Sequence, residues 1–245
     1  MPIKYESLFY NNSMSNYSKE LKKAIENDDD ALADTIINVM LADEKVEVKD
    51  EKIRAIMREL FEEGLDVFPR SVSETIIHDG ESITLTKRQY ENFKQIYSQA
   101  NDKVSSLINT KGFEDSPSVV KAKSIKYIYD YYYEEALKDL LGIDSDAKKY
   151  LFAQAIDITK LAMIVSQVSQ IEADVDKNGK TISGSRKEKI IALLNSMNLT
   201  AIQKYMLMGY FGYKNANGER QVKTYIQSLK LTKTEKETLL SMCGY

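Results

Sequence analysis

Apolar residues recur every three or four positions along most of the chain, a spacing that places them on one face of an α-helix. Between residues 17 and 63 this pattern predicts three helices, with apolar stripes that include Leu21, Ile36 and Ile53. We interpret the acidic run 28–30 as the start of the second helix and Gly64 as the end of the third.

The period changes from helical to alternating between residues 74 and 85. Two short β-branched runs flank Asp79 and Gly80, a pair favoured in tight turns, so a small β-hairpin is predicted there. An isolated hairpin is only marginally stable in water, and we therefore expect it to pack on helices.

Three long helices are predicted after residue 86. Thr86 with Gln89 forms a capping box before the first, Ser116 is the predicted N-cap of the second with Pro117 in its first turn, and Ser145 precedes a continuous helix over 147–171. Helices of this length favour a bundle.

Five tyrosines gather in the second long helix, at positions 127, 129, 131, 132 and 133. Helical spacing places Ile125, Ile128 and Tyr132 on one stripe with Ala136 and Leu140, while the other tyrosines point elsewhere. No single face presents all five, so we interpret the cluster as core and interface and not as a surface for stacking on bases or sugars.

The C-terminal region contains an internal repeat. Residues 190–213 align with 222–245 at an offset of 32, and each copy predicts helix, short connection, capped second helix and glycine stop. The identical pairs are Ser196/Ser228, Leu199/Leu231, Thr200/Thr232, Lys204/Lys236, Leu207/Leu239, Gly212/Gly244 and Tyr213/Tyr245.

Together these patterns predict a mainly α fold, a multi-helix bundle with one small β-hairpin and two C-terminal αα-hairpin repeats. The predicted regions are a three-helix region at 1–68, a β-hairpin with the long-helix bundle at 69–172, and a turn with two tandem helix-turn-helix repeats at 173–245. A single αα-hairpin cannot bury its apolar stripe, so the repeats should stack on each other or on preceding helices.

Charge is distributed unevenly although the net charge is only −3. Residues 1–80 carry 10 Lys and Arg against 18 Asp and Glu, whereas residues 180–245 carry 11 against 4. This asymmetry indicates an anionic partner for the C-terminal region, or contacts between oppositely charged parts of neighbouring subunits.

Several chemical classes are disfavoured by composition. With one Cys, Cys243, and one His, His78, the chain lacks an intrachain disulfide and the ligands for a Cys/His zinc site. No segment approaches the run of about 18 apolar residues that a membrane span needs, and the N-terminus lacks the features of a secretory signal. We expect assembly in a reducing cytoplasm.

A candidate calcium turn lies at 174–179, where Asp174, Asp176 and Asn178 alternate before Gly179. The twelfth position of an EF-hand loop would be Ser185 and not Glu, and Glu188 would point away around the following helix. We favour a structural turn in which Ser183 or Ser185 caps that helix.

Two further site hypotheses follow from charged residues. A carboxylate-only enzyme site would draw on Asp130, Glu134 and Asp157, but the Glu-x-x-His pairs of di-metal bundles are absent, so no catalytic or cofactor-binding residue is assigned. A nucleic-acid module would use basic residues of the repeats, which are Lys187, Lys189, Lys223 and Lys230.

The segment "KNGKTISGSRKEKIIALLNSMNLTAIQKYML" and the closing "YIQSLKLTKTEKETLLSMCGY" resemble a C-terminal region of large virion-associated proteins of tailed bacteriophages that infect Firmicutes. The upstream "ITLTKRQYENFKQIYSQANDKVSSLI" and "KAKSIKYIYDYYYEEALKDLL" are similar to the same proteins. Those proteins are much longer, so the resemblance implies a short stand-alone gene or an excised segment.

The resemblance implies a non-enzymatic structural or assembly module of the phage particle, in the tail, near the portal or inside the virion. It would act through contacts with other phage structural proteins or with copies of itself as a homo-oligomer, without a cofactor. The alternative is the nucleic-acid module, which would make a weak DNA contact through the basic C-terminal hairpins.

Overall fold

The computed structural model describes residues 20–36 except 22, 25, 28, 30 and 34, then 51–65, 67, 74–78, 81–143 and 148–245. Over these residues the fold is mainly helical with one small antiparallel hairpin, which confirms the predicted fold class. The chain divides into two compact units, residues 1–142 and 143–245. The stretch 69–172, which the sequence pattern grouped together, is thus divided at Gly142.

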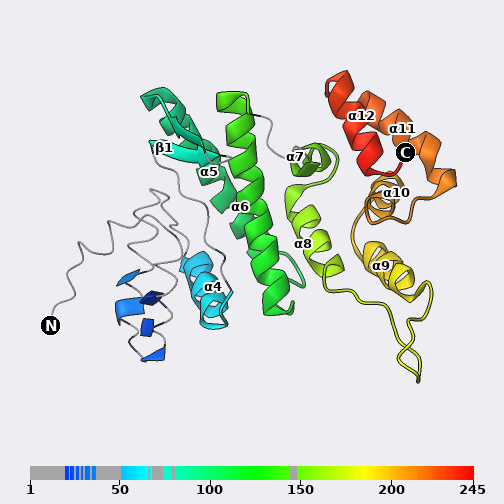
Figure 1. Ribbon diagram of the computed structural model, residues 1–245, viewed down its shortest axis with the longest axis horizontal. Helices are drawn as coiled ribbons and strands as arrows, with labels where there is room; N and C mark the ends of the chain where they lie inside the picture. The colour runs from blue at the N-terminus through cyan, green and yellow to red at the C-terminus, as the bar shows by residue number, and fades with distance from the viewer. Residues whose placement is uncertain are drawn as a thin grey trace. The chain divides into compact units, whose positions relative to one another are not determined.

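The first unit contains α4 (Glu51–Glu62), β1 (Thr75–His78), β2 (Glu81–Thr84), α5 (Lys87–Ile108) and α6 (Ser118–Leu141). Figure 1 shows α5 and α6 side by side, and α4 packs on both. The hairpin pairs Thr75 with Thr84 and His78 with Glu81, while its predicted Asp79-Gly80 turn lies outside the described residues.

The predicted helix boundaries of this unit are partly confirmed. Asp29 accepts a hydrogen bond from the backbone N–H of Leu32 at 3.0 Å, and Gly64 has a φ of 78° just after α4. Thr86 and Gln89 form the predicted capping box. The prediction for α6 was wrong by one residue, since Pro117 is the N-cap and the Ser116 hydroxyl donates to the carbonyl of Gly112.

Tyrosines of α6 lie in the core, as predicted. The ring of Tyr129 is 5.7 Å from that of Tyr97, its hydroxyl donates to Asn101 at 2.9 Å, and the Tyr133 ring packs edge-on against Phe93. Burial extends beyond the single stripe that helical spacing predicts, because Tyr129, Tyr131 and Tyr133 are also buried. Leu140, expected on the stripe, is only half-buried.

The second unit begins with α7 (Lys148–Ala153) and α8 (Ile158–Val168). The predicted continuous helix over 147–171 is wrong, because the chain turns between them and Asp157 caps α8 by accepting from the backbone N–H of Thr159 at 3.0 Å. The carbonyl of Ala155 at this break accepts a hydrogen bond from the side chain of Gln203 at 2.9 Å. Ser145, the predicted cap, lies outside the described residues.

Four helices complete this unit: α9 (Ser185–Ser196), α10 (Ala201–Tyr210), α11 (Ala216–Ser228) and α12 (Lys233–Met242). Figure 1 shows them as two successive helical hairpins. The offset of 32 maps both ends of α10 onto those of α12 and the last residue of α9 onto the last residue of α11. The predicted repeat therefore exists as two copies of one αα-hairpin.

Matching hydrogen bonds hold the two hairpins in the same shape. Both second helices start with a capping box, Thr200 with Gln203 and Thr232 with Glu235. The ammonium groups of Lys204 and Lys236 both reach back to the preceding helix, to the side chain of Asn195 at 3.0 Å and the carbonyl of Gln227 at 2.7 Å. Gln227 is the counterpart of Asn195 in the repeat.

Each hairpin is also closed by its final tyrosine. The Tyr213 hydroxyl accepts a hydrogen bond from Arg186 in the first turn of α9, at 3.2 Å. The Tyr245 hydroxyl donates to the carbonyl of Asn215, the N-cap of α11, at 2.9 Å. The glycines before these tyrosines have φ values of 86° and 77°, which reverse the chain after each second helix.

Across the ranges that the structure describes, no helix combines the length and apolar character needed to cross a membrane.

Candidate functional site

A pocket of about 480 Å³ opens between α9, α10 and the start of α11, at the junction of the two hairpins. This volume lies within the range of ligand pockets in proteins. The lining residues are Lys187, Ile191, Leu194, Asn195, Lys204, Tyr205, Met208, Tyr213, Lys214, Asn215 and Ala216.

The pocket combines apolar walls with cationic side chains. Ile191 supplies the exposed apolar surface, with 38% of its area accessible, while Leu194 and Met208 are buried behind it at 1% and 9%. Three lysines line the same space, Lys187 and Lys204 from α9 and α10 and Lys214 from the connection to α11. None of the lining residues is acidic. The site is therefore suited to a ligand that carries both negative charge and an apolar group.

Local hydrogen bonds fix the polar edge of the pocket. The bond from Lys204 to Asn195 orients both side chains between α9 and α10. Asn215 caps α11 by accepting from the backbone N–H of Asn217 at 2.9 Å, so the positive end of the α11 dipole borders the pocket. The helix N-terminus adds to the attraction of the lysines for negative charge.

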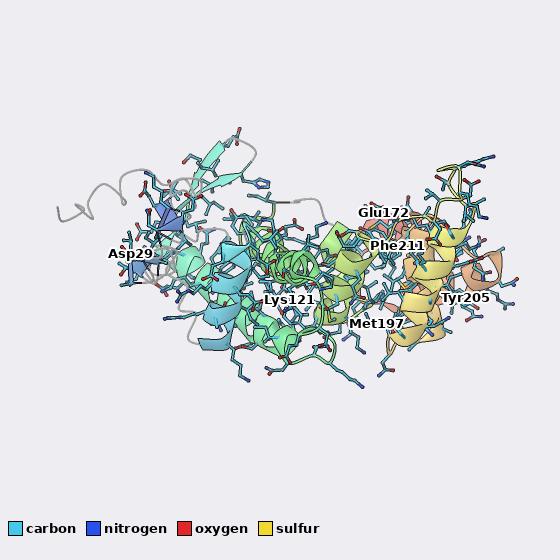
Figure 2. All side chains as sticks on the ribbon, turned by 90° about the horizontal axis from the view of Figure 1, so that it is seen from below. Asp29, Lys121, Glu172, Met197, Tyr205 and Phe211 are labelled. Atoms are coloured by element: carbon cyan, nitrogen blue, oxygen red, sulfur yellow. The ribbon has the colours of Figure 1, made fainter. Side chains whose placement is uncertain are left out.

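Tyr205 forms a wall of the pocket because α11 carries glycine where the ring meets it. A Cβ on Gly218 would lie 2.5 Å from Cγ of Tyr205, so only glycine permits this approach. Tyr205 is labelled in Figure 2, on the C-terminal unit. Tyr213, the second tyrosine of the lining, accepts a hydrogen bond from Arg186. Arg186 also donates to the carbonyl of Ile171 at 3.0 Å.

A second close glycine contact joins the ends of the two hairpins. A Cβ on Gly209 of α10 would lie 1.8 Å from the carbonyl oxygen of Cys243, just after α12. Cys243 itself is fully buried, and burial raises the pKa of its thiol to about 12. At neutral pH the side chain is a packed thiol and not a thiolate nucleophile.

The candidate calcium turn forms a short hairpin whose carboxylates have protein partners. Asp176 accepts hydrogen bonds from the backbone N–H groups of Asn178 and Lys180, at 2.8 and 2.9 Å, while Asp174 pairs with Lys189 at 2.5 Å. The reversal at Gly179, with a φ of 76°, completes the turn. These contacts account for the Asp-x-Asp-x-Asn-Gly pattern as a turn.

The predicted helix cap after this turn was wrong. Gly184, with a φ of 85°, is the N-cap of α9, and no side chain caps the helix. Ser185 is instead the first helical residue, where its buried hydroxyl accepts from the backbone N–H of Asp174 and donates to the carbonyl of Ile182. It ties the two ends of the turn together.

The four lysines proposed for nucleic-acid contact do not share one environment. Lys187 lines the pocket, and Lys230 is exposed in the connection between α11 and α12. Lys189 is paired with Asp174, and Lys223 is paired with Glu219 at 2.5 Å, which lowers the pKa of the Glu219 carboxyl through this hydrogen bond and the lysine charge.

The three carboxylates considered for an enzyme site belong to different units of the chain. Asp157 caps α8, while Asp130 and Glu134 lie on α6 in the first unit. Among the described residues, no three His, Cys, Asp or Glu side chains form a group that could hold a metal ion. His78 lies at the end of β1.

Sequence reasoning missed most of the pocket. It assigned Lys187 to a nucleic-acid surface and did not connect it with Tyr205, Lys204 or Lys214. The signal that could have found these residues is the comparison of the two repeats position by position. Such a comparison separates positions that the hairpin fold retains from positions that have diverged.

Comparison of the chain with protein-family models, with curated proteins and with solved structures finds no match.

Proposed function

We propose that the chain is a non-enzymatic structural or assembly module of a bacteriophage particle, in the tail, near the portal or inside the virion. It acts through contacts with other particle proteins or with further copies of itself. The resemblance to virion-associated proteins of Firmicutes phages provides the biological setting of this proposal.

The observation that carries the proposal is the construction of the second unit. Two copies of a capped hairpin build a helical scaffold, and their junction presents a basic pocket with apolar walls. Stacked helical hairpins commonly offer surfaces of this kind to other proteins. The acidic balance of residues 1–80 and the basic balance of residues 180–245 further favour contacts between subunits.

The nucleic-acid module is the alternative function. Two of its four lysines, Lys189 and Lys223, have carboxylate partners within the same unit, which would have to be displaced for a phosphate to bind. Neutralising Lys187 and Lys230 should flatten the salt dependence of DNA binding if this function holds, and absence of binding at low salt would eliminate it.

The proposed function is tested by following the chain into particles. A tagged chain is produced in bacterial cells infected with the phage that encodes it, and particles are banded on a density gradient. The proposal predicts that the chain bands with the particles after a high-salt wash. Recovery only in the soluble fraction, together with a soluble marker protein, would contradict it.

A further inference from the structure

The two hairpins provide an internal comparison that separates folding from binding. The end of the first helix, both ends of the second helix and the capping boxes correspond, and in each copy a lysine and the final tyrosine bond back to an earlier part of the hairpin. Residues that differ between the copies and take no part in these contacts are therefore not required by the hairpin itself.

Three of the differences between the copies fall on the lining of the pocket. Lys187, Ile191 and Tyr205 in the first hairpin correspond to Glu219, Lys223 and Glu237 in the second. The first replacement reverses a charge, and the other two exchange apolar surface for charge. The second hairpin folds with these residues, so Lys187, Ile191 and Tyr205 are not required to build a hairpin of this kind.

From this divergence and the composition of the lining, we propose that the pocket is the docking site for an acidic peptide segment of a partner protein. One large apolar side chain of the segment lies against Ile191, the exposed part of the apolar wall. Its carboxylates face Lys187, Lys204 and Lys214. The inference deepens the proposed assembly function, because it states the chemistry of the partner at this site.

Both halves of the lining are needed to select this occupant. A free phosphate or a DNA backbone would satisfy the lysines but would leave the apolar wall without a partner. An uncharged apolar segment would cover Ile191 but would bring no negative charge to the three ammonium groups. An acidic segment with one apolar anchor matches both requirements.

The test uses the full chain and a short fluorescein-labelled peptide in which Asp and Glu flank a Phe-Leu pair. Binding is followed by fluorescence anisotropy at low and at physiological salt. We expect saturable binding that weakens as salt rises. Replacing the Phe-Leu pair with Ser-Ser should abolish it, whereas equal binding of the Ser-Ser peptide would overturn the proposal.

The repeat offers a matched pair of variants, Lys204→Ala and Lys236→Ala. Each removes one exposed lysine hydrogen bond to the preceding helix, from Lys204 to the Asn195 side chain or from Lys236 to the Gln227 carbonyl, so we expect similar small shifts of the urea midpoint. Only Lys204 lines the pocket. We expect Lys204→Ala to weaken peptide binding by about fivefold and Lys236→Ala to leave it unchanged. Equal effects would overturn the proposal.

A third variant, Ile191→Lys, separates the apolar contact from charge. The second hairpin carries Lys223 at the equivalent position, so the substitution is compatible with the fold. Purely electrostatic attraction would make this variant bind the acidic peptide more tightly. Docking against the apolar wall predicts weaker binding instead, and tighter binding would overturn it.

Competition experiments, in which another ligand displaces the labelled peptide, test for other occupants of the pocket. Displacement of the peptide by duplex DNA or by inorganic phosphate at lower concentration than by unlabelled peptide would overturn the peptide proposal and favour that anion. Loss of the peptide-docking proposal can be distinguished from loss of the proposed assembly function. A chain that bands with particles without binding the peptide retains the assembly function, whereas peptide binding without particle association retains only the docking site.

Discussion

At the scale of single residues, two glycines are required by contacts between helices and not by helix geometry. Gly209 and Gly218 are helical, and their counterparts in the other hairpin are Ser241 and Arg186. A side chain is therefore acceptable at these positions of the hairpin. It is excluded where Cys243 or Tyr205 packs against the glycine.

Gly209→Ala should destabilise the second unit by about 1–3 kcal/mol, because the added methyl group meets the carbonyl of Cys243 and the backbone must shift. Urea unfolding followed by circular dichroism measures this change. The exposed counterpart Ser241 provides the control, since Ser241→Ala should alter stability by no more than about 0.5 kcal/mol. Equal effects of the two substitutions would contradict the close contact.

Burial of Cys243 predicts a specific pH dependence. Because folding raises the pKa of the thiol from 9.0 to about 12, its contribution to stability is fully present below pH 9 and is lost as pH rises from 9 toward 12. The difference in urea midpoint between the wild-type chain and Cys243→Ala should therefore be smaller at pH 10 than at pH 8. Parallel profiles for the two proteins would show that the thiol is not buried in the folded state.

At the scale of secondary-structure elements, local signals in the sequence predicted the capping boxes at Thr86, Thr200 and Thr232. The two residues of each capping box lie three positions apart, so a short stretch of sequence is enough to predict it. The break between α7 and α8 was not predictable in this way. The apolar period runs through it, and the carbonyl of the buried Ala155 accepts a hydrogen bond from Gln203, which is distant in the sequence.

Asp157→Ala distinguishes the observed break from a continuous helix by the sign of its effect. As the N-cap of α8, Asp157 should contribute about 1 kcal/mol, which the substitution removes. Within a continuous helix the same change would stabilise the chain, because alanine has the higher helix propensity. The free energy of unfolding from urea titration gives the sign, and an increase would contradict the structure.

At the scale of the whole molecule, the repeat could be predicted from sequence, but the pocket between its copies could not. Its lining comes from α9, α10, the connection that follows α10 and the start of α11, and only the folded unit brings Lys187 and Lys214 to the same pocket. The proposed assembly role depends on this surface and on the opposed charge of the two ends of the chain. Its partners should therefore be other proteins or further copies.

The mass of the chain in solution tests this account most directly. Light scattering is measured on the purified 28.0 kDa chain across a range of concentrations, alone and after addition of proteins released from the phage particle. An assembly module should form a defined oligomer, or a stable complex with one of the particle proteins. A mass of 28.0 kDa at every concentration, unchanged by the particle proteins, would contradict it.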